Sequence, residues 1–217
     1  MDATVTTNDR IYWNGFYRTD EAEVLLAPSQ FAAFALGETA DADVVFDIGC
    51  GTGRDSLFLA AFGKKVVGVD SSVSATTLCQ KAAESRRLNA TFITADVLDA
   101  DLAKRLNILR AGRTACVYAR FFLHAIDEFR EDAFLTLAKS LAEGGYLAVE
   151  FRTNQDIGGA KVTPDHYRRF INPKQFEQKT LSLGFEKLYG TIGKGYAKYK
   201  QDDAHVARYI FKGSDAC

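Results

Sequence analysis

An acid followed by three glycines at alternate positions stands early in the chain, in Asp47-Ile48-Gly49-Cys50-Gly51-Thr52-Gly53. The apolar run 44–48 before it predicts a strand, and the apolar spacing of 54–62 after it predicts a helix. Glycines let the backbone turn tightly and approach a ligand without Cβ clashes, and a helix N-terminus offers unpaired N–H groups to an anionic group. This pattern favours a ligand site, and a tight strand–helix turn without a ligand is the alternative.

Two further acids end predicted strands. Asp70 ends the strand expected at 65–70, where a carboxylate with Ser71 beside it can accept both hydroxyls of a ribose. Asp96 ends the strand expected at 91–96, beside Val97, where its carboxylate could face an adenine amino group. Three strand ends therefore agree on one nucleoside-containing ligand.

Two common nucleotide motifs are missing from this region of the sequence. The GxGxxG spacing of nicotinamide dinucleotide enzymes fails, because Arg54 or Ser56 stands where its last glycine would be. The chain also lacks the GxxxxGK[ST] motif of phosphate-binding loops. Both absences count against a dinucleotide or nucleoside-triphosphate site.

The acid and the three glycines, with Asp70, resemble the DxGxGxG motif and the second acid of class I S-adenosylmethionine-dependent methyltransferases. The resemblance covers about residues 44 to 152. It implies S-adenosylmethionine as cofactor, with the methionine part held by the first acid and the glycine loop and the ribose held by the second acid. It implies these cofactor-binding residues: Asp47, Gly49, Cys50, Gly51, Gly53, Asp70, Ser71, Asp96, Val97 and Arg120.

The expected fold is α/β and Rossmann-like. Apolar strands alternating with helices predict a doubly wound, mostly parallel seven-stranded sheet with an antiparallel C-terminal strand and helices on both faces. A single domain over 1–217 is expected, with an N-terminal helical cap or lid (1–40), a cofactor-binding core (44–152) and a substrate-side helix with closing strands (153–217). The remaining elements are expected as helices at 74–86 and 131–141, a helix capped by Ser29, a helix from Asn172 to about Gly184, and strands at 116–120, 145–152, 185–192 and 205–212.

Polar residues follow the fourth and fifth expected strands, where ligands bind in open α/β sheets. His124 is the first candidate general base because histidine titrates near neutral pH, and the alternative is a partly buried histidine bonded to a backbone carbonyl. Guanidinium forks suit phosphate and carboxylate oxygens, so three arginine-bearing segments predict an anionic acceptor. The candidate catalytic or substrate-binding residues here are Arg120, His124, Arg152, His166, Arg168 and Arg169.

Each of these interpretations has an alternative. The arginines would otherwise form structural salt bridges with Glu150, Asp156 and Asp165. A sugar hydroxyl would need a general base, for which His166 is the second candidate, whereas an ionised acceptor needs none. Three aromatic residues are expected either to cover the substrate as a lid or to pack a helix on the sheet edge: Tyr12, Trp13 and Tyr17.

Composition narrows the possible partners. The chain has 217 residues and a formal net charge of −1, which gives no general attraction to nucleic acid or to an anionic membrane. The polar N-terminus is unlike a secretory signal, so we expect a cytoplasmic protein with reduced thiols, as monomer or homodimer. Its 4 cysteines and 3 histidines show no metal-ligand spacing, so no metal is expected.

The expected function is methylation of a small molecule, most simply at oxygen. The segments 120–124, 166–169 and 193–197 are similar to small bacterial methyltransferases of surface-glycan and natural-product pathways. Methylation of nitrogen or of a macromolecule is one alternative, and the absence of a DPPY or NPPY motif after the fourth strand counts against it. A non-enzymatic module that binds S-adenosylmethionine is the other.

Overall fold

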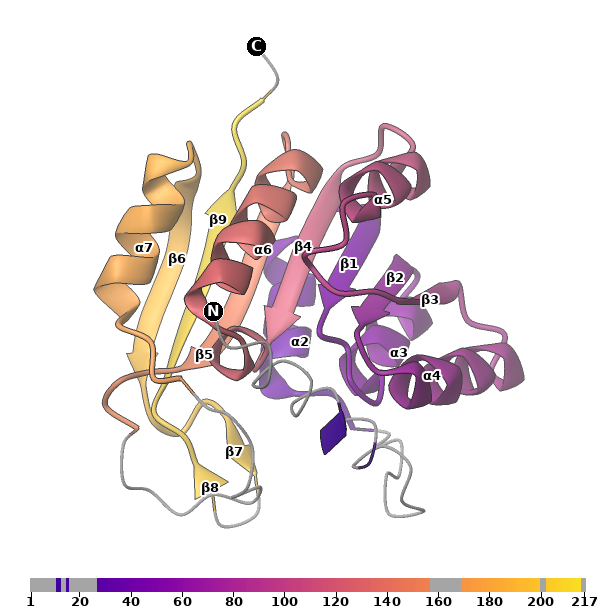
Figure 1. Cartoon of the computed structure of the whole chain (residues 1–217), viewed down its shortest axis with the longest axis horizontal. Helices are drawn as coiled ribbons and strands as arrows, with labels where there is room; N and C mark the ends of the chain where they lie inside the picture. The colour runs from indigo at the N-terminus through magenta and orange to yellow at the C-terminus, as the bar shows by residue number, and fades with distance from the viewer. Residues whose placement is uncertain (1–10, 13–14, 16–26, 157–168, 200–201, 216–217) are drawn as a thin grey trace.

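The computed structural model describes residues 11–12, 15, 27–156, 169–199 and 202–215. Its centre is a seven-stranded sheet in the order β3-β2-β1-β4-β5-β9-β6 (Figure 1). β9 is antiparallel to both of its neighbours, and the other neighbouring strands are parallel. The expected fold class is therefore confirmed. The strands are β1 (Val44–Ile48), β2 (Lys65–Asp70), β3 (Ala90–Thr94), β4 (Ala115–Arg120), β5 (Tyr146–Arg152), β6 (Glu186–Gly193) and β9 (Val206–Lys212).

Helices cover both faces of this sheet (Figure 1). One buried apolar cluster joins one sheet face to α2 (Gln30–Glu38), α3 (Arg54–Ala61) and the end of α4 (Val73–Ser85). A second cluster joins the opposite face to α5 (Leu102–Arg110), α6 (Glu128–Leu141) and α7 (Pro173–Ser182). Burial of an apolar stripe on each helix thus holds the three layers together.

Local capping explains where several helices begin. Ser29 accepts a hydrogen bond from the backbone nitrogen of Ala32 and starts α2, as expected. Asn172 caps α7 in the same way and Pro173 takes its first position. Asp127 caps α6, so this helix begins three residues before the expected Glu131.

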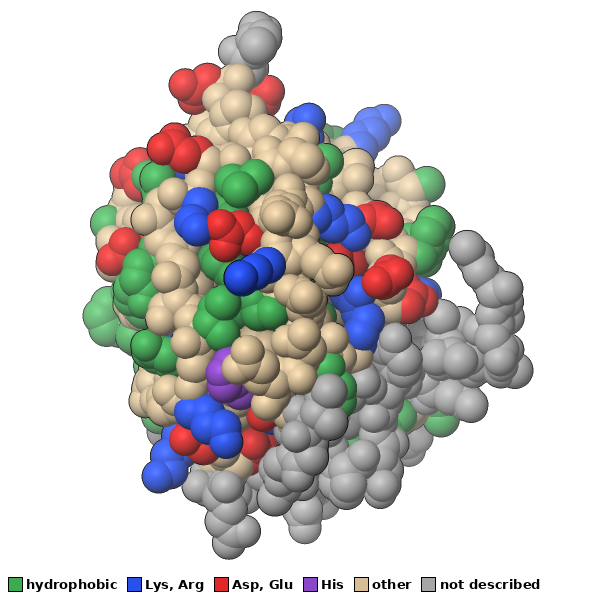
Figure 2. Space-filling model, turned by 90° about the vertical axis from the view of Figure 1, so that its left-hand side faces the viewer, with side chains coloured by type: hydrophobic (Ala, Val, Ile, Leu, Met, Phe, Trp, Pro, Cys, Tyr) green, Lys and Arg blue, Asp and Glu red, His purple; other side chains and the backbone are tan. Residues whose placement is uncertain are grey.

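A short hairpin of β7 (Lys198–Tyr199) and β8 (Asp202–Asp203) lies at the end of the molecule where the parallel strands finish (Figure 1). On the face that carries α7 and β6, acidic and basic side chains are interspersed with apolar ones (Figure 2). Within the described ranges, no helix combines the length and the hydropathy that a membrane span requires.

Candidate functional site

The glycine loop between β1 and α3 depends on its glycines. Gly49, Gly51 and Gly53 have φ values of 76°, 53° and 73°, in the left-handed region that other residues rarely adopt. A Cβ atom on Gly49 would lie 2.5 Å from Cδ2 of Phe122, and one on Gly53 would lie 2.7 Å from Sγ of Cys79. The loop is therefore packed closely from behind, and its backbone can turn toward a ligand only because no side chain intervenes.

Asp70, at the end of β2, holds this loop in place. Its Oδ2 accepts a hydrogen bond from the backbone nitrogen of Gly51 at 3.0 Å, and its Oδ1 accepts one from the backbone nitrogen of Ser72 at 2.9 Å. Burial raises the pKa of Asp70 in spite of these donors. The side chain sits beside the loop at the carboxyl edge of the sheet, where the sequence predicts it.

Asp47, at the end of β1, is almost fully buried beneath the loop, with 3% of its surface exposed. Ser56 donates a hydrogen bond from Oγ to its Oδ2 at 2.5 Å. Burial raises the pKa of Asp47 to about 7, because the ionised form loses water and the Ser56 hydroxyl compensates only in part. A cationic group of a ligand would lower this pKa again.

A pocket opens between the glycine loop and β4. Four of its lining residues were not predicted as site residues from the sequence: Thr52, Arg54, Asp55 and Tyr118. The acidic and basic side chains in it suit a ligand that carries both charges. The full lining is Asp47, Gly49, Cys50, Gly51, Thr52, Arg54, Asp55, Tyr118 and Arg120.

The carboxylate oxygens of Asp55 are hydrogen-bonded to other residues of the protein. It accepts hydrogen bonds from the backbone nitrogen and the hydroxyl of Ser29 at 2.8 and 2.7 Å, from the hydroxyl of Tyr118 at 2.9 Å and from Nε of Arg54 at 3.3 Å. Burial would raise its pKa, but Arg120, Arg54 and the Ser29 donors outweigh burial and hold the pKa below its ordinary value. Four donors fill the acceptor capacity of a carboxylate, so Asp55 joins α2 to α3 and β4.

Asp96 lies in the loop after β3, because that strand ends at Thr94 and not at Asp96 as expected. Its Oδ1 accepts a hydrogen bond from the backbone nitrogen of Leu98 at 3.0 Å. Its Oδ2 lies 3.3 Å from both Nε and Nη2 of Arg130 on α6, a partner that the sequence did not indicate. Val97 packs against the apolar cluster on the sheet face that α5, α6 and α7 cover.

The arginines expected to bind an anionic acceptor all have carboxylate partners where the structure describes them. Arg120 donates from Nε to Oε1 of Glu150 at 2.8 Å. Arg152 donates to Asp156 at 2.6 Å and to Asp202, and Arg169 pairs with Glu131 and Glu128. This arrangement corresponds to the alternative of structural salt bridges, and the partners Glu150 and Asp156 are those that the sequence suggested.

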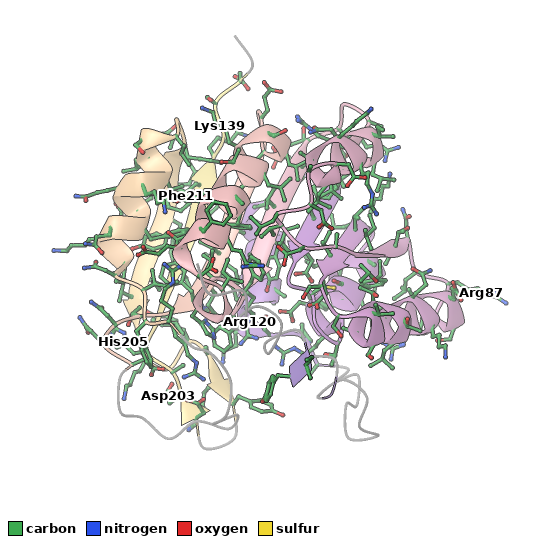
Figure 3. All side chains as sticks on the ribbon, in the orientation of Figure 1. Arg87, Arg120, Lys139, Asp203, His205 and Phe211 are labelled. Atoms are coloured by element: carbon green, nitrogen blue, oxygen red, sulfur yellow. The ribbon has the colours of Figure 1, made fainter. Side chains whose placement is uncertain are left out.

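Figure 3 shows Arg120 at the carboxyl edge of the sheet, toward the end of the molecule that holds Asp203 and His205 and away from Lys139. Arg169, in contrast, is bound to α6 through Glu131 and does not line the pocket. The structure therefore brings only Arg120, of the described arginines proposed for the acceptor, to the pocket beside the glycine loop.

His124 lies in a 3-10 turn, Leu123–Ala125, after β4, and only 4% of its surface is exposed. Its Nδ1 accepts a hydrogen bond from the backbone nitrogen of Arg152 at 3.4 Å, whereas a bond to a backbone carbonyl was the expected alternative. Because Nδ1 uses its lone pair on an N–H donor, the neutral ring carries its proton on Nε2. This geometry favours a structural role over general-base catalysis.

Several sequence-derived candidates lie outside the residues that the structure describes: Trp13, Tyr17, Asp165, His166 and Arg168. Tyr12 is helical and partly exposed, and the lid that Tyr12, Trp13 and Tyr17 would form over the substrate stays a prediction. In the described part of the chain, no group of three histidine, cysteine or acidic residues could hold a metal ion, and Cys50, Cys79 and Cys116 are free thiols.

Comparison with known proteins bears on this site. A family model described as a methyltransferase domain matches residues 45–145, which include the glycine loop, Asp70 and Asp96. No curated protein matches the chain.

Solved structures of low sequence identity share the fold. A SAM-dependent methyltransferase from Anabaena variabilis ATCC 29413 is 17% identical, with a TM-score of 0.72 over 98% of this chain and 96% of that one. Magnesium protoporphyrin IX methyltransferase from Synechocystis PCC 6803, solved with bound SAH, is 20% identical, with a TM-score of 0.57 over 83% and 78%. A protein solved in work on the conversion of a disulfide bond into a thioacetal group during echinomycin biosynthesis is 20% identical, with a TM-score of 0.68 over 97% and 92%.

These likenesses to solved structures establish the fold, and the family match establishes the domain at residues 45–145. The glycine loop and the second acid lie inside the matched range. Residues 45–145 therefore form a methyltransferase domain, in a chain whose fold is shared by S-adenosylmethionine-dependent methyltransferases.

Proposed function

We propose that this enzyme methylates a small-molecule acceptor at the carboxyl edge of the sheet. The observation that carries this proposal is the contact between Asp70 and the backbone nitrogen of Gly51 beside a left-handed glycine loop. It supports a site in which the Asp70 carboxylate would bind a ribose beside a pocket that would take an amino-acid group. S-adenosylmethionine would supply a sulfonium methyl group there.

In this proposal each of three acids binds a different part of the cofactor. Asp47 faces the α-ammonium group, because it is the buried pocket acid whose Oδ1 makes no hydrogen bond to the described residues. Asp70 accepts the ribose hydroxyls, because its two backbone donors leave acceptor capacity unused. Asp96 receives the adenine amino group while Arg130 balances its charge.

In this reaction the protein mainly has to align the methyl donor with the acceptor. Methyl transfer is an in-line displacement, and holding donor and acceptor in line can supply about 7–11 kcal/mol of barrier lowering in favourable cases. The rigid loop fixes the donor side, because Gly49 packs against Phe122 and Asp70 holds Gly51.

For the acceptor we propose an oxygen nucleophile, with an uncharged hydroxyl such as that of a sugar favoured over a phosphate or carboxylate. Arg152 and Arg169 are already neutralised by carboxylates and would have to break these pairs to bind an anion. A hydroxyl needs a general base, and His166 remains the predicted one because Nδ1 of His124 is engaged. One structural neighbour acts on magnesium protoporphyrin IX and another belongs to echinomycin biosynthesis, which supports a small-molecule acceptor.

The test is a panel of acceptors assayed for release of S-adenosylhomocysteine. Sugar hydroxyls should be methylated with kcat/KM at least about tenfold above matched phosphates and carboxylates. Methylation confined to the anionic members would contradict the acceptor class. Methylation of nitrogen nucleophiles or of a macromolecule would favour the second candidate activity, and cofactor binding without turnover on any acceptor would favour a binding module.

A further inference from the structure

β6 (Glu186–Gly193) is the last strand of the sheet and has a neighbouring strand on one side only, which is β9. It has 8 residues and is therefore longer than an average strand. No hydrogen bond joins its backbone to a described residue outside β9. One row of its N–H and C=O groups is thus open to a further strand, at the end of the sheet that lies opposite β3 (Figure 1).

The β3 edge of the sheet, in contrast, is covered by the protein itself. α4 packs against β3, and the backbone nitrogen of Phe92 donates a hydrogen bond to Oε1 of Gln80 on α4 at 3.1 Å. Natural edge strands are protected by such cover, by charged side chains, by proline or by a β-bulge. β6 has a bulge at Leu188, but its residues 188–193 include neither a charged residue nor a proline. Most of this edge is therefore unprotected.

Exposed apolar side chains lie along the β6 edge. Leu188 and Ile192 on β6 are 51% and 44% exposed. Leu181 on α7 is 39% exposed, and it lies on the same side of the helix as Glu177, four residues before it. Because Glu177 pairs with Lys187 on β6, that side of α7 borders the open strand. An exposed apolar patch of this kind marks a surface for a protein partner.

The sequence of β6 is complementary to itself when two copies run antiparallel. With a twofold axis at Gly190, Leu188 of one copy lies opposite Ile192 of the second copy, and Tyr189 lies opposite Thr191. Gly190 has no side chain at the axis, where two identical side chains would otherwise meet. The pairs that form are apolar or join an aromatic to a β-branched residue, and cross-strand pairs of these kinds stabilise a sheet.

The charges at the two ends of β6 favour the same direction. Glu186 begins the strand and Lys194 follows its last residue, and no ion pair joins either side chain to the described residues. Lys187 is already neutralised by Glu177. Antiparallel pairing brings Glu186 of each copy within reach of Lys194 of the other, whereas parallel pairing would place like charges side by side.

We propose that β6 pairs with β6 of a second copy of this chain, so that two sheets join into one in a twofold-symmetric homodimer. A contact that uses the same surface on both copies closes on itself and covers the open edge of each. β6 is separated from the pocket at β4 by β5 and β9, so dimerisation can be tested independently of the proposed methyl transfer.

Sedimentation velocity of the full chain over a dilution series tests the proposal. The wild type should sediment with twice the 23.9 kDa mass of one chain and should dissociate on dilution. Leu188→Lys and Ile192→Lys should each raise the dissociation constant by about tenfold or more, because the symmetric contact contains each substitution twice. Amide hydrogen exchange in 186–193 should slow above the dissociation constant, because the open N–H groups become bonded.

A charge-reversal cycle tests the antiparallel direction. Glu186→Lys and Lys194→Glu should each weaken the dimer by about threefold to tenfold, because an attraction becomes a repulsion in both copies of the pair. The double variant Glu186→Lys/Lys194→Glu should return to within about twofold of the wild type.

Ile108→Lys is the matched control. Ile108 is an apolar residue that is 68% exposed, but it lies on α5, away from β6 and α7. This substitution should leave the dissociation constant of the dimer unchanged. Leu188→Lys and Ile192→Lys should also keep the affinity of the wild type for S-adenosylhomocysteine. If either of them does not fold, the charge-reversal cycle decides, because Glu186 and Lys194 are both exposed.

Three outcomes would overturn the proposal. A wild type that keeps the mass of one chain at every concentration would show that this edge does not bind a second copy. A dimer that Leu188→Lys and Ile192→Lys leave intact would have its contact elsewhere. A double charge reversal that weakens the dimer as much as the two single reversals combined would exclude the antiparallel pairing of Glu186 with Lys194.

Discussion

The carboxylate of Asp70 accepts a hydrogen bond from the backbone nitrogen of Gly51 at 3.0 Å, joining the end of β2 to the glycine loop after β1. The acid proposed to bind the ribose thus also fixes the loop proposed to bind the methionine part. Because β1 and β2 are adjacent parallel strands, their carboxyl ends bring the two motifs together although 19 residues separate them. Loop shape and cofactor affinity should therefore depend on one side chain.

Binding of S-adenosylhomocysteine should strengthen as pH rises through about 7. In the ligand-free protein burial raises the pKa of Asp47 to about 7, and the ammonium group of the ligand requires its ionised form. Below that pH the affinity should fall by at most about tenfold per pH unit, since one proton is linked to binding. Calorimetry between pH 5.5 and 8 measures this, and Asp47→Asn should flatten the profile; an unchanged slope in that variant would assign the effect to another group.

The contribution of Asp47 to the stability of the ligand-free protein should fall as pH rises, whereas its contribution to ligand binding should grow. Its pKa in the folded state lies above the unfolded value, so the stability it contributes is full at acidic pH and is lost as pH rises through about 7. Asp47→Asn should therefore raise the free energy of unfolding relative to wild type at pH 8 more than at pH 5. Urea titrations at both values provide the measurement, and the reverse order would contradict the burial argument.

Substitution of His124 should separate a structural role from a catalytic one. Asn can accept the backbone N–H of Arg152 in place of Nδ1, so His124→Asn should keep kcat within about tenfold of wild type, whereas loss of a general base costs about 10²–10⁴. His124→Ala leaves that buried N–H without an acceptor and should lower the free energy of unfolding by about 1–3 kcal/mol. A hundredfold fall in kcat for His124→Asn, with unchanged affinity for S-adenosylmethionine and for the acceptor, would identify His124 as the general base.

The Asp55 network should contribute strongly to stability. Asp55→Ala leaves Ser29 and Tyr118 without their acceptor and Arg54 without its partner, and loss of one partner from a buried charged network costs about 3–5 kcal/mol. Tyr118→Phe removes one hydrogen bond and should cost about 1 kcal/mol. Denaturant unfolding distinguishes these values, and an Asp55→Ala protein within 1 kcal/mol of wild type would contradict this account of the network.

The sequence predicted the sheet and the glycine loop well, because both are local signals. Four apolar residues and Asp47 before a glycine-rich turn mark β1, and the structure has the same bounds, Val44–Ile48. Asn172 and Pro173 likewise mark the start of α7. α5 was missed, because its amphipathic signal is short: Leu102 and Leu106 are its buried residues.

The charged partners could not be predicted, because they depend on strand order. Arg208 meets Glu150 only because β9 inserts next to β5, and Arg130 meets Asp96 only because the start of α6 lies beside the loop that follows β3. Sequence spacing offered Glu150 and Asp156 as possible partners but gave no sign of Asp202, which lies 50 residues from Arg152. The expected role of the arginines changed for this reason.

Calorimetric titration of wild type and Asp70→Ala with S-adenosylhomocysteine tests the central claim most directly. The wild type should bind, and Asp70→Ala should weaken binding by about 1.5–3 kcal/mol, or roughly 10–100-fold, as the ribose contact and the loop anchor are lost together. Tight binding of a nicotinamide dinucleotide by the wild type, with none of S-adenosylhomocysteine, would contradict the cofactor assignment.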